Sequence, residues 1–167
     1  MRYLSLDWIE EIGRLVAADL SLQALGSKHT IGITQVITDS PDGTVTYHLQ
    51  SGNGRVTFGA GAAEPEDVRL EQEYFSAVDV ATGEITAEDA FITGCIRLSG
   101  NAPLLLECQA VFAGLDPIFT AVPTAPTIRR FGSSPYKTIR AICISPNLVI
   151  SDFVHRWQTA CGLSSSK

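Results

Sequence analysis

The spacing of apolar residues changes near residue 30, and this change constrains the fold more than any other feature. Before it, five apolar residues follow the i, i+4, i+7, i+8 spacing of one helix face: Trp8, Ile12, Leu15, Val16 and Leu20. After it, apolar and polar residues alternate, which is typical of strands with one buried side. The sequence therefore predicts a helix over residues 7–25 that is followed by a sheet.

The ends of this predicted helix carry residues that suit a start and a stop. Asp7 is the expected N-cap, because its carboxylate can accept a hydrogen bond from a free backbone N–H group. Glu10 follows it at the spacing of a capping box. Gly26 is the expected end of the helix.

Four strands are expected next, and three apolar residues share one face of the first: Ile31, Ile33 and Ile37. Gln35 interrupts this face. Turn-forming residues at 41–43 and 51–54 separate the strands that follow. Residues 68–74 show the most regular alternation in the chain. Consecutive strands of this kind predict an antiparallel sheet that is covered on one side.

The second half of the domain returns to helical spacing. Ser76 and Thr86 are each followed three residues later by an aspartate, so both are expected to cap short helices. A fifth strand is expected over residues 95–99 and a last helix from residue 102 to about 122. The predicted fold is α+β, with a five-stranded, mostly antiparallel sheet covered on one side by helices.

Charge divides the chain into two parts. Residues 1–123 hold 17 acidic and six basic side chains, whereas residues 124–167 hold six basic side chains against Asp152 alone. The net charge of −6 argues against a nucleic-acid partner, which normally meets a basic surface. We expect a folded domain over residues 5–122 and a basic extension over residues 123–167.

Two interpretations of the extension remain open. A strand over residues 138–144 and a helix over 145–161 are expected within it. Basic side chains would give transient contact with an anionic membrane through Arg129, Arg130, Lys137, Arg140 and Arg156. The alternative is a solvated extension without a partner.

No arrangement of reactive side chains predicts catalysis, a metal or a cofactor. The histidines are scattered, and the four cysteines lack the spacing of metal ligands: His29, His48, His155, Cys95, Cys108, Cys143 and Cys161. A cluster of acidic residues is typical of a solvent-exposed sheet edge: Glu64, Glu66, Asp67, Glu71 and Glu73. The first residues lack the apolar segment of a signal peptide, so a reduced, cytoplasmic protein is expected.

An ordered motif lies between Phe75 and Asn101. It contains Ala-Thr-Gly-Glu at residues 81–84, a short acidic helix that ends in Ala-Phe-x-x-Gly at 90–94, and a strand that ends in Gly100 and Asn101. This order resembles the sterol carrier protein type 2 family of lipid-binding domains, in its bacterial stand-alone form. The resemblance covers about residues 5–122.

The resemblance implies an apolar tunnel between sheet and helices that binds a sterol, a fatty acid or a fatty acyl thioester without changing it chemically. The expected lining combines aliphatic, aromatic and two amide side chains: Ile33, Gln35, Tyr47, Phe58, Leu70, Gln72, Phe75, Val78, Phe91, Ile92, Phe112, Leu115 and Phe119. Gln35 and Gln72 interrupt apolar rows. They are expected to bond either a ligand head group or a water, or to be satisfied within the protein.

Two other functions stay open. The chain could be an enzyme that uses the tunnel to act on an apolar biosynthetic intermediate, with Gln35, Tyr47, His48 or Gln72 as its polar groups. It could also be a protein-binding accessory domain with a filled core. The sequence decides neither the ligand nor the oligomeric state.

Overall fold

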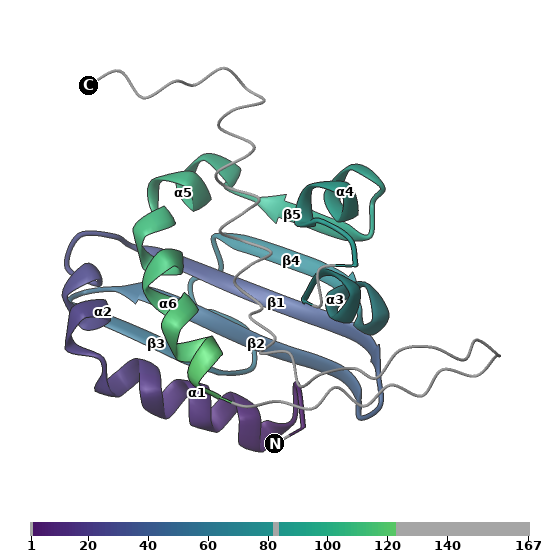
Figure 1. Cartoon of the computed structure of the whole chain (residues 1–167). Coiled ribbons are helices and arrows are strands. Elements are labelled where there is room, and N and C mark those ends of the chain that lie inside the picture. The colour runs from purple at the N-terminus through teal and green to yellow at the C-terminus, as the bar shows by residue number, and fades with distance from the viewer. Residues whose placement is uncertain (1, 82–83, 123–167) are drawn as a thin grey trace, which may run out of the picture.

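The computed structural model describes residues 2–81 and 84–122 (Figure 1). The extension 123–167, with the strand, helix and membrane contact expected there, lies outside the described residues. The helices and strands follow in chain order: α1 (Leu6–Ala18), α2 (Leu20–Leu25), β1 (Ile31–Ser40), β2 (Gly43–Gly52), β3 (Arg55–Ala60), β4 (Val68–Glu73), α3 (Tyr74–Ala81), α4 (Ala87–Ile92), β5 (Ile96–Gly100), α5 (Ala102–Glu107) and α6 (Gln109–Ala121).

The strands form one five-stranded sheet with the order β3-β2-β1-β4-β5. The pairs β1–β2, β2–β3 and β4–β5 are antiparallel, and β1–β4 is parallel. The helices lie on one side of this sheet (Figure 1). The predicted α+β fold with a mostly antiparallel sheet is therefore confirmed, but the fourth strand pairs with the first rather than with the third.

The predicted N-terminal helix is two helices. The Ser5 hydroxyl, and not Asp7, caps α1 by accepting a hydrogen bond of 3.3 Å from the Trp8 N–H group. Asp19 ends α1 in an extended conformation and caps α2, accepting from the Leu22 N–H group at 2.9 Å. The chain therefore changes direction at Asp19, and Leu20 lies 84% exposed instead of on the buried helix face.

Of the two helix caps predicted at Ser76 and Thr86, the structure has the one at Thr86. The Thr86 hydroxyl accepts from the Asp89 N–H group, which confirms the expected start of α4. Ser76 caps nothing, because α3 begins at Tyr74, directly after β4. The last predicted helix is divided at Cys108 into α5 and α6.

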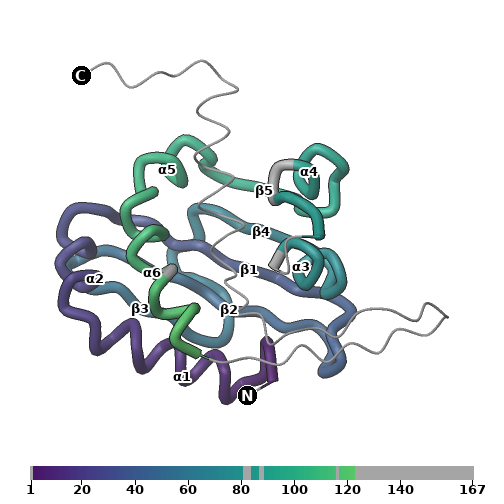
Figure 2. The backbone as a smooth tube through the Cα atoms, in the orientation of Figure 1, coloured from purple at the N-terminus to yellow at the C-terminus, as the bar shows by residue number. Residues whose placement is uncertain are grey.

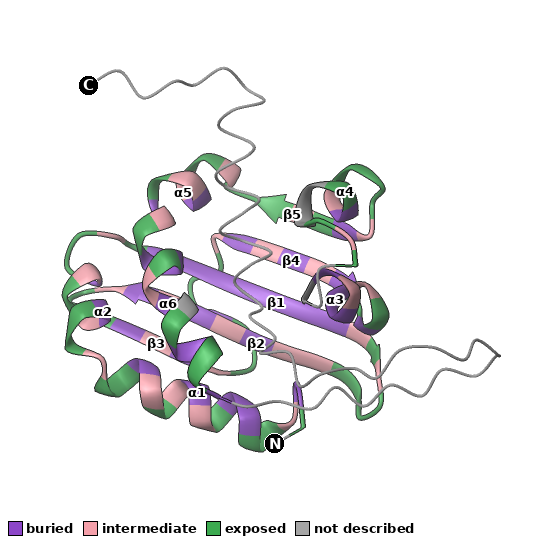
Figure 3. Cartoon of the chain, in the orientation of Figure 1, coloured by how far each residue is buried: buried purple, intermediate pink, exposed green. Residues whose placement is uncertain are grey.

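Residues 61–67 cross the outer face of the sheet, the side without helices, as they connect β3 to β4. The Ala63 N–H group donates to the Thr34 hydroxyl at 3.0 Å, and the Asp67 carboxylate accepts from the Gly32 N–H group at 2.8 Å. A side chain at Gly32 would overlap the carbonyl oxygen of Pro65. This outer crossing buries both faces of β1 from residue 31 to residue 37 (Figure 3).

The helices pack in two groups on the other face. In the first, α1, α2 and α6 contact one another, and α1 and α2 cover β3. In the second, α3 and α4 contact each other, with α3 on β1 and β4 and α4 on β5. The backbone trace shows the two groups over different parts of the sheet (Figure 2).

Candidate functional site

Cross-strand register brings several predicted lining residues together at the centre of the sheet. Gln35 of β1 is aligned with Tyr47 of β2 and with Leu70 of β4. These three side chains share the helix-facing side, since residues aligned across neighbouring strands point the same way. The sheet thus presents one polar pair in a mostly apolar surface.

Most of the predicted lining is buried. The residues with less than a tenth of their surface exposed are Ile33, Gln35, Tyr47, Phe58, Leu70, Gln72, Val78, Phe112, Leu115 and Phe119. Phe91 is half-buried. Burial places these side chains inside the domain, and their contact with a ligand stays a prediction.

Phe75 and Ile92 correct the expectation that all of these residues face the sheet. Their side chains are 49% and 72% exposed. In α3, Tyr74, Ala77 and Val78 are buried at the helical spacing of one face, and Val80 is buried as well. Phe75 lies on another, exposed side of that helix.

Aromatic side chains fill the part of the interior under α1 and α6. The Trp8 ring lies 6.2 Å from the rings of both Tyr47 and Phe58, and 5.8 Å from that of Phe119, measured between centroids. The Tyr3 ring meets Trp8 edge-on at 5.3 Å. Such contacts stabilise the packing beyond the area they bury.

Gln35 has its hydrogen-bond partner inside the protein. The hydroxyl of Tyr47 donates to its carbonyl oxygen, and both residues are buried. Burial raises the pKa of Tyr47 well above its ordinary value, and the neighbouring Tyr3 raises it further. The phenol is therefore protonated at neutral pH and keeps its role as donor.

Gln72 differs from Gln35, although both interrupt apolar rows. It is 8% exposed, and its carbonyl oxygen has no hydrogen-bond partner within the part of the chain that the structure describes. A buried acceptor without a partner costs about 1–3 kcal/mol. Gln72 also lines a cavity of about 240 Å³ whose walls include Thr38, Glu71, Glu73, Ser76, Thr93 and Arg97.

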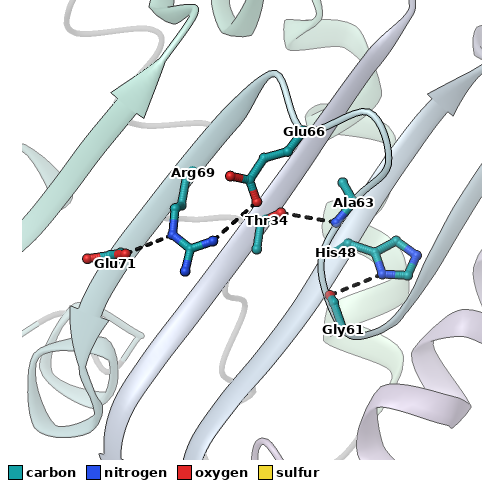
Figure 4. Close-up of polar contacts among 7 residues, drawn as sticks. All are labelled: Thr34, His48, Gly61, Ala63, Glu66, Arg69 and Glu71. Carbon is teal, nitrogen blue, oxygen red and sulfur yellow. Dashed lines mark hydrogen bonds and ion pairs between the residues drawn. The ribbon is translucent and has the colours of Figure 1, made fainter.

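The outer face of the sheet holds the other polar residues that the sequence brought forward. Arg69 bonds both Glu66 and Glu71, at 3.3 and 2.7 Å (Figure 4). His48 lies on the same face, with its Nδ1 atom 3.2 Å from the Gly61 carbonyl oxygen (Figure 4). These contacts hold residues 61–67 against the strands. They also place His48 on the opposite side of the sheet from Gln35 and Tyr47.

The cysteine, histidine and acidic side chains form no reactive cluster among the described residues. Burial, with smaller contributions from Glu107 and Asp67, raises the pKa of Cys108 to about 11, so that its thiol stays protonated at neutral pH. Among residues 2–81 and 84–122, no group of three or more histidine, cysteine or acidic side chains is placed to hold a metal ion. Within the same residues, no helix has the length and apolar character needed to cross a membrane.

Part of the chain matches a curated protein. No family model matches the sequence. The peroxisomal multifunctional enzyme A of Dictyostelium discoideum is 34% identical over 67 residues. The match covers 40% of this chain and 15% of that protein, so the chain corresponds to a small part of its length.

Several solved structures are similar in fold. The sterol carrier protein domain 2 of Helicoverpa armigera has a TM-score of 0.47 at 16% identity, over 65% of this chain and 85% of that one. A crystal structure of sterol carrier protein 2 has the same TM-score and identity, and the match covers 70% of this chain and 96% of that one. The sec-alkylsulfatase Pisa1 of Pseudomonas sp. has a TM-score of 0.40 at 21% identity, over 57% of this chain and 15% of that one. All three TM-scores lie below 0.5, and all three identities lie below 25%.

Proposed function

We propose that this chain binds an apolar lipid in a tunnel between its sheet and its helices, and carries it without chemical change. The candidate ligands are a sterol, a fatty acid or a fatty acyl thioester, and the proposed place of action is the cytoplasm. The motif at residues 75–101 and the α+β fold both support this function. The proposal treats the buried residues of the predicted lining as the wall of the tunnel.

The division of the helices into two groups is the observation that carries the proposal. One helix-facing surface of the sheet, apolar except for Gln35, the Tyr47 hydroxyl and Gln72, lies under both groups. Aromatic rings fix the first group on the sheet, whereas α3 contacts β1 and β4 and α4 contacts β5. We therefore propose that the ligand lies at the seam between the two helix groups.

Burial of an alkyl chain supplies enough free energy for useful affinity. Each methylene that leaves water gains about 0.8 kcal/mol, so a chain of ~16 carbons gains roughly 12 kcal/mol before the costs of association are subtracted. Micromolar binding needs about 8 kcal/mol. A lipid can therefore bind at this seam with few polar contacts.

The arrangement of the polar residues favours binding over catalysis. Tyr47 and Gln35 bond each other, and His48 lies on the far side of the sheet. A general acid or base must reach the reacting atom directly or through one water. The four polar residues considered for an enzyme therefore do not converge on one point.

Native mass spectrometry of the purified full chain tests the proposal, followed by organic extraction of what is bound. We expect one lipid molecule per chain. A chain that arrives empty and also fails to take up a fluorescent fatty acid and a fluorescent sterol would contradict lipid binding. That result would favour the protein-binding accessory domain with a filled core.

A further inference from the structure

Two exposed apolar side chains lie beside the cavity at the end of β4. The walls of this cavity, of about 240 Å³, include Ser76 in α3 and Thr93 directly after α4. Phe75 precedes the first and Ile92 precedes the second, and their side chains are 49% and 72% exposed. Because α3 and α4 contact each other, we treat the two side chains and the cavity as one surface, the α3–α4 surface (Figure 1).

The acidic side chains of the α3–α4 surface outnumber the basic ones. Glu71 and Glu73 line the cavity, together with Arg97. Glu71 is aligned with Arg97 across the strands and also binds Arg69 at 2.7 Å. Glu73 is exposed, and its carboxylate forms no ion pair with a side chain of the described residues. This surface therefore suits a segment that is both apolar and basic.

The extension contains such a segment outside the described residues. In the helix expected over residues 145–161, the spacing places Val149, Phe153 and Trp157 on one face. Arg156 follows Val149 by seven residues and Phe153 by three, so it belongs to the edge of that face. The expected helix thus combines an apolar face with one guanidinium group.

Charge and chain length both favour contact within one chain. Residues 1–123 carry a net charge of −11, and residues 124–167 one of +5. Opposite charges of this kind attract the two parts to each other. Residues 123–144 lie between α6 and the expected helix. Fully extended, they span roughly 70 Å, several times the ~14 Å radius of gyration of a domain of this size.

We propose that residues 145–161 dock on the α3–α4 surface of the same chain. The apolar face of the expected helix covers Phe75 and Ile92, and Arg156 pairs with Glu73. A flexible connection holds such a segment at an effective concentration on the order of 1 mM, so a contact with a Kd of ~0.1 mM is about nine-tenths occupied. The docking gives the extension a partner within the protein and does not depend on the proposed lipid binding.

Trp157 reports the docking, because the chain has one other tryptophan, Trp8, and that residue is buried. The fluorescence of the full chain is quenched with acrylamide, and Trp157→Phe supplies the contribution of Trp8. We expect Trp157 to be quenched about tenfold more weakly than in the chain unfolded by urea, since about nine-tenths of the chains are docked. Docking within one chain also makes this protection independent of protein concentration.

Two matched substitutions test the apolar contact. Ile92→Ser should weaken docking by about tenfold, because an aliphatic side chain no longer leaves water. The docked fraction then falls to about half, and the quenching constant of Trp157 rises about fivefold. Leu20→Ser is the control, because Leu20 is an equally apolar side chain, 84% exposed, on α2. It should leave the quenching of Trp157 unchanged.

An exchange of charges tests the proposed ion pair. Glu73→Lys places two basic groups opposite each other, so it should raise the quenching constant of Trp157. Arg156→Glu alone should do the same. The double variant restores opposite charges and should return the protection of Trp157 to the level of the unchanged chain. A general defect of the fold would not be rescued in this way.

Each other outcome would overturn the proposal in a definite way. Trp157 quenched in the folded chain as strongly as in urea would show that the extension does not dock. Equal protection in the unchanged chain and in Ile92→Ser would exclude the α3–α4 surface. Protection that grows with protein concentration would identify a second copy, rather than the same chain, as the source of the docked segment. Absence of rescue in the double variant would exclude the pair of Arg156 and Glu73.

Discussion

Tyr47 and Gln35 face each other from neighbouring antiparallel strands, and the phenol donates its hydrogen bond to the amide oxygen. Both residues are buried, with Gln35 5% and Tyr47 3% exposed. Each residue therefore satisfies a polar atom that would otherwise destabilise the interior.

Removal of the Tyr47 hydroxyl should be costly. Tyr47→Phe leaves the Gln35 oxygen buried and unpaired, so we expect the free energy of unfolding to fall by about 1–3 kcal/mol. Urea denaturation of the full chain measures it. In the double variant with Gln35→Met, part of this loss should be recovered, since both polar atoms are then gone. Strictly additive losses would show that the two residues are not coupled.

Stability should decline in alkali. Burial raises the pKa of Tyr47 and of Tyr3, so both stay protonated in the folded chain at pH values where the unfolded chain loses these protons. The unfolded state then binds fewer protons, and stability is complete below about pH 10 and falls above it.

The expected slope is about 1.4 kcal/mol per pH unit for each tyrosine that ionises only on unfolding. Urea denaturation at pH 9, 10 and 11 gives the slope. Tyr3→Phe should reduce it, whereas the exposed Phe75→Leu should not. A stability that is flat to pH 11 would contradict the burial of both phenols.

The outer crossing leaves no space at Gly32. Gly32→Ala places a methyl group on the carbonyl oxygen of Pro65, so we expect a loss of about 1–3 kcal/mol or more in unfolding free energy. Gly114→Ala is the control, because its methyl group meets only flexible side-chain ends, those of Leu22 at 2.9 Å and Leu25 at 3.5 Å. That substitution also gains up to about 1 kcal/mol of helix propensity and should be nearly neutral. Equal losses in the two variants would contradict the close packing of the crossing.

The two interpretations of the basic extension predict different results with vesicles. Contact with an anionic membrane predicts that deletion of residues 124–167 lowers co-sedimentation with anionic vesicles, and that salt does the same to the full chain. A solvated extension predicts no difference between the two chains. Neutral vesicles serve as the control, because basic side chains are not attracted to them.

Sequence periodicity predicted the elements well where each depends on its own residues. The alternation at residues 68–74 and the capping pair at Thr86 and Asp89 are local, and both appear in the structure. The break at Asp19 was missed because apolar spacing continues across it to Leu20, and only the extended conformation of Asp19 interrupts the helix. The parallel β1–β4 pair was missed because turn signals cannot say which strands become neighbours.

In the candidate site, too, the sequence predicted local features but not those that depend on strand pairing. Gln35 and Gln72 look alike in sequence, since each interrupts an apolar row. They differ only through their neighbours across the strands: Gln35 meets Tyr47, whereas Gln72 lies between Ile37 and Ile96. Register decides these neighbours, and no local pattern contains it. Exposure of Phe75 was missed for a similar reason, since α3 starts at Tyr74 without the predicted cap.

The outer crossing also imposes an order on assembly. Residues 61–67 bond to Gly32 and Thr34 of β1 and to Gln50 of β2, so we expect the crossing to form after the β1–β2 hairpin. The parallel partner β4 comes after it, at a much greater sequence separation from β1. Pairings of this kind form slowly because a long loop must close first. We therefore expect β4, which carries Gln72, and its neighbour β5 to be the last strands to join the sheet.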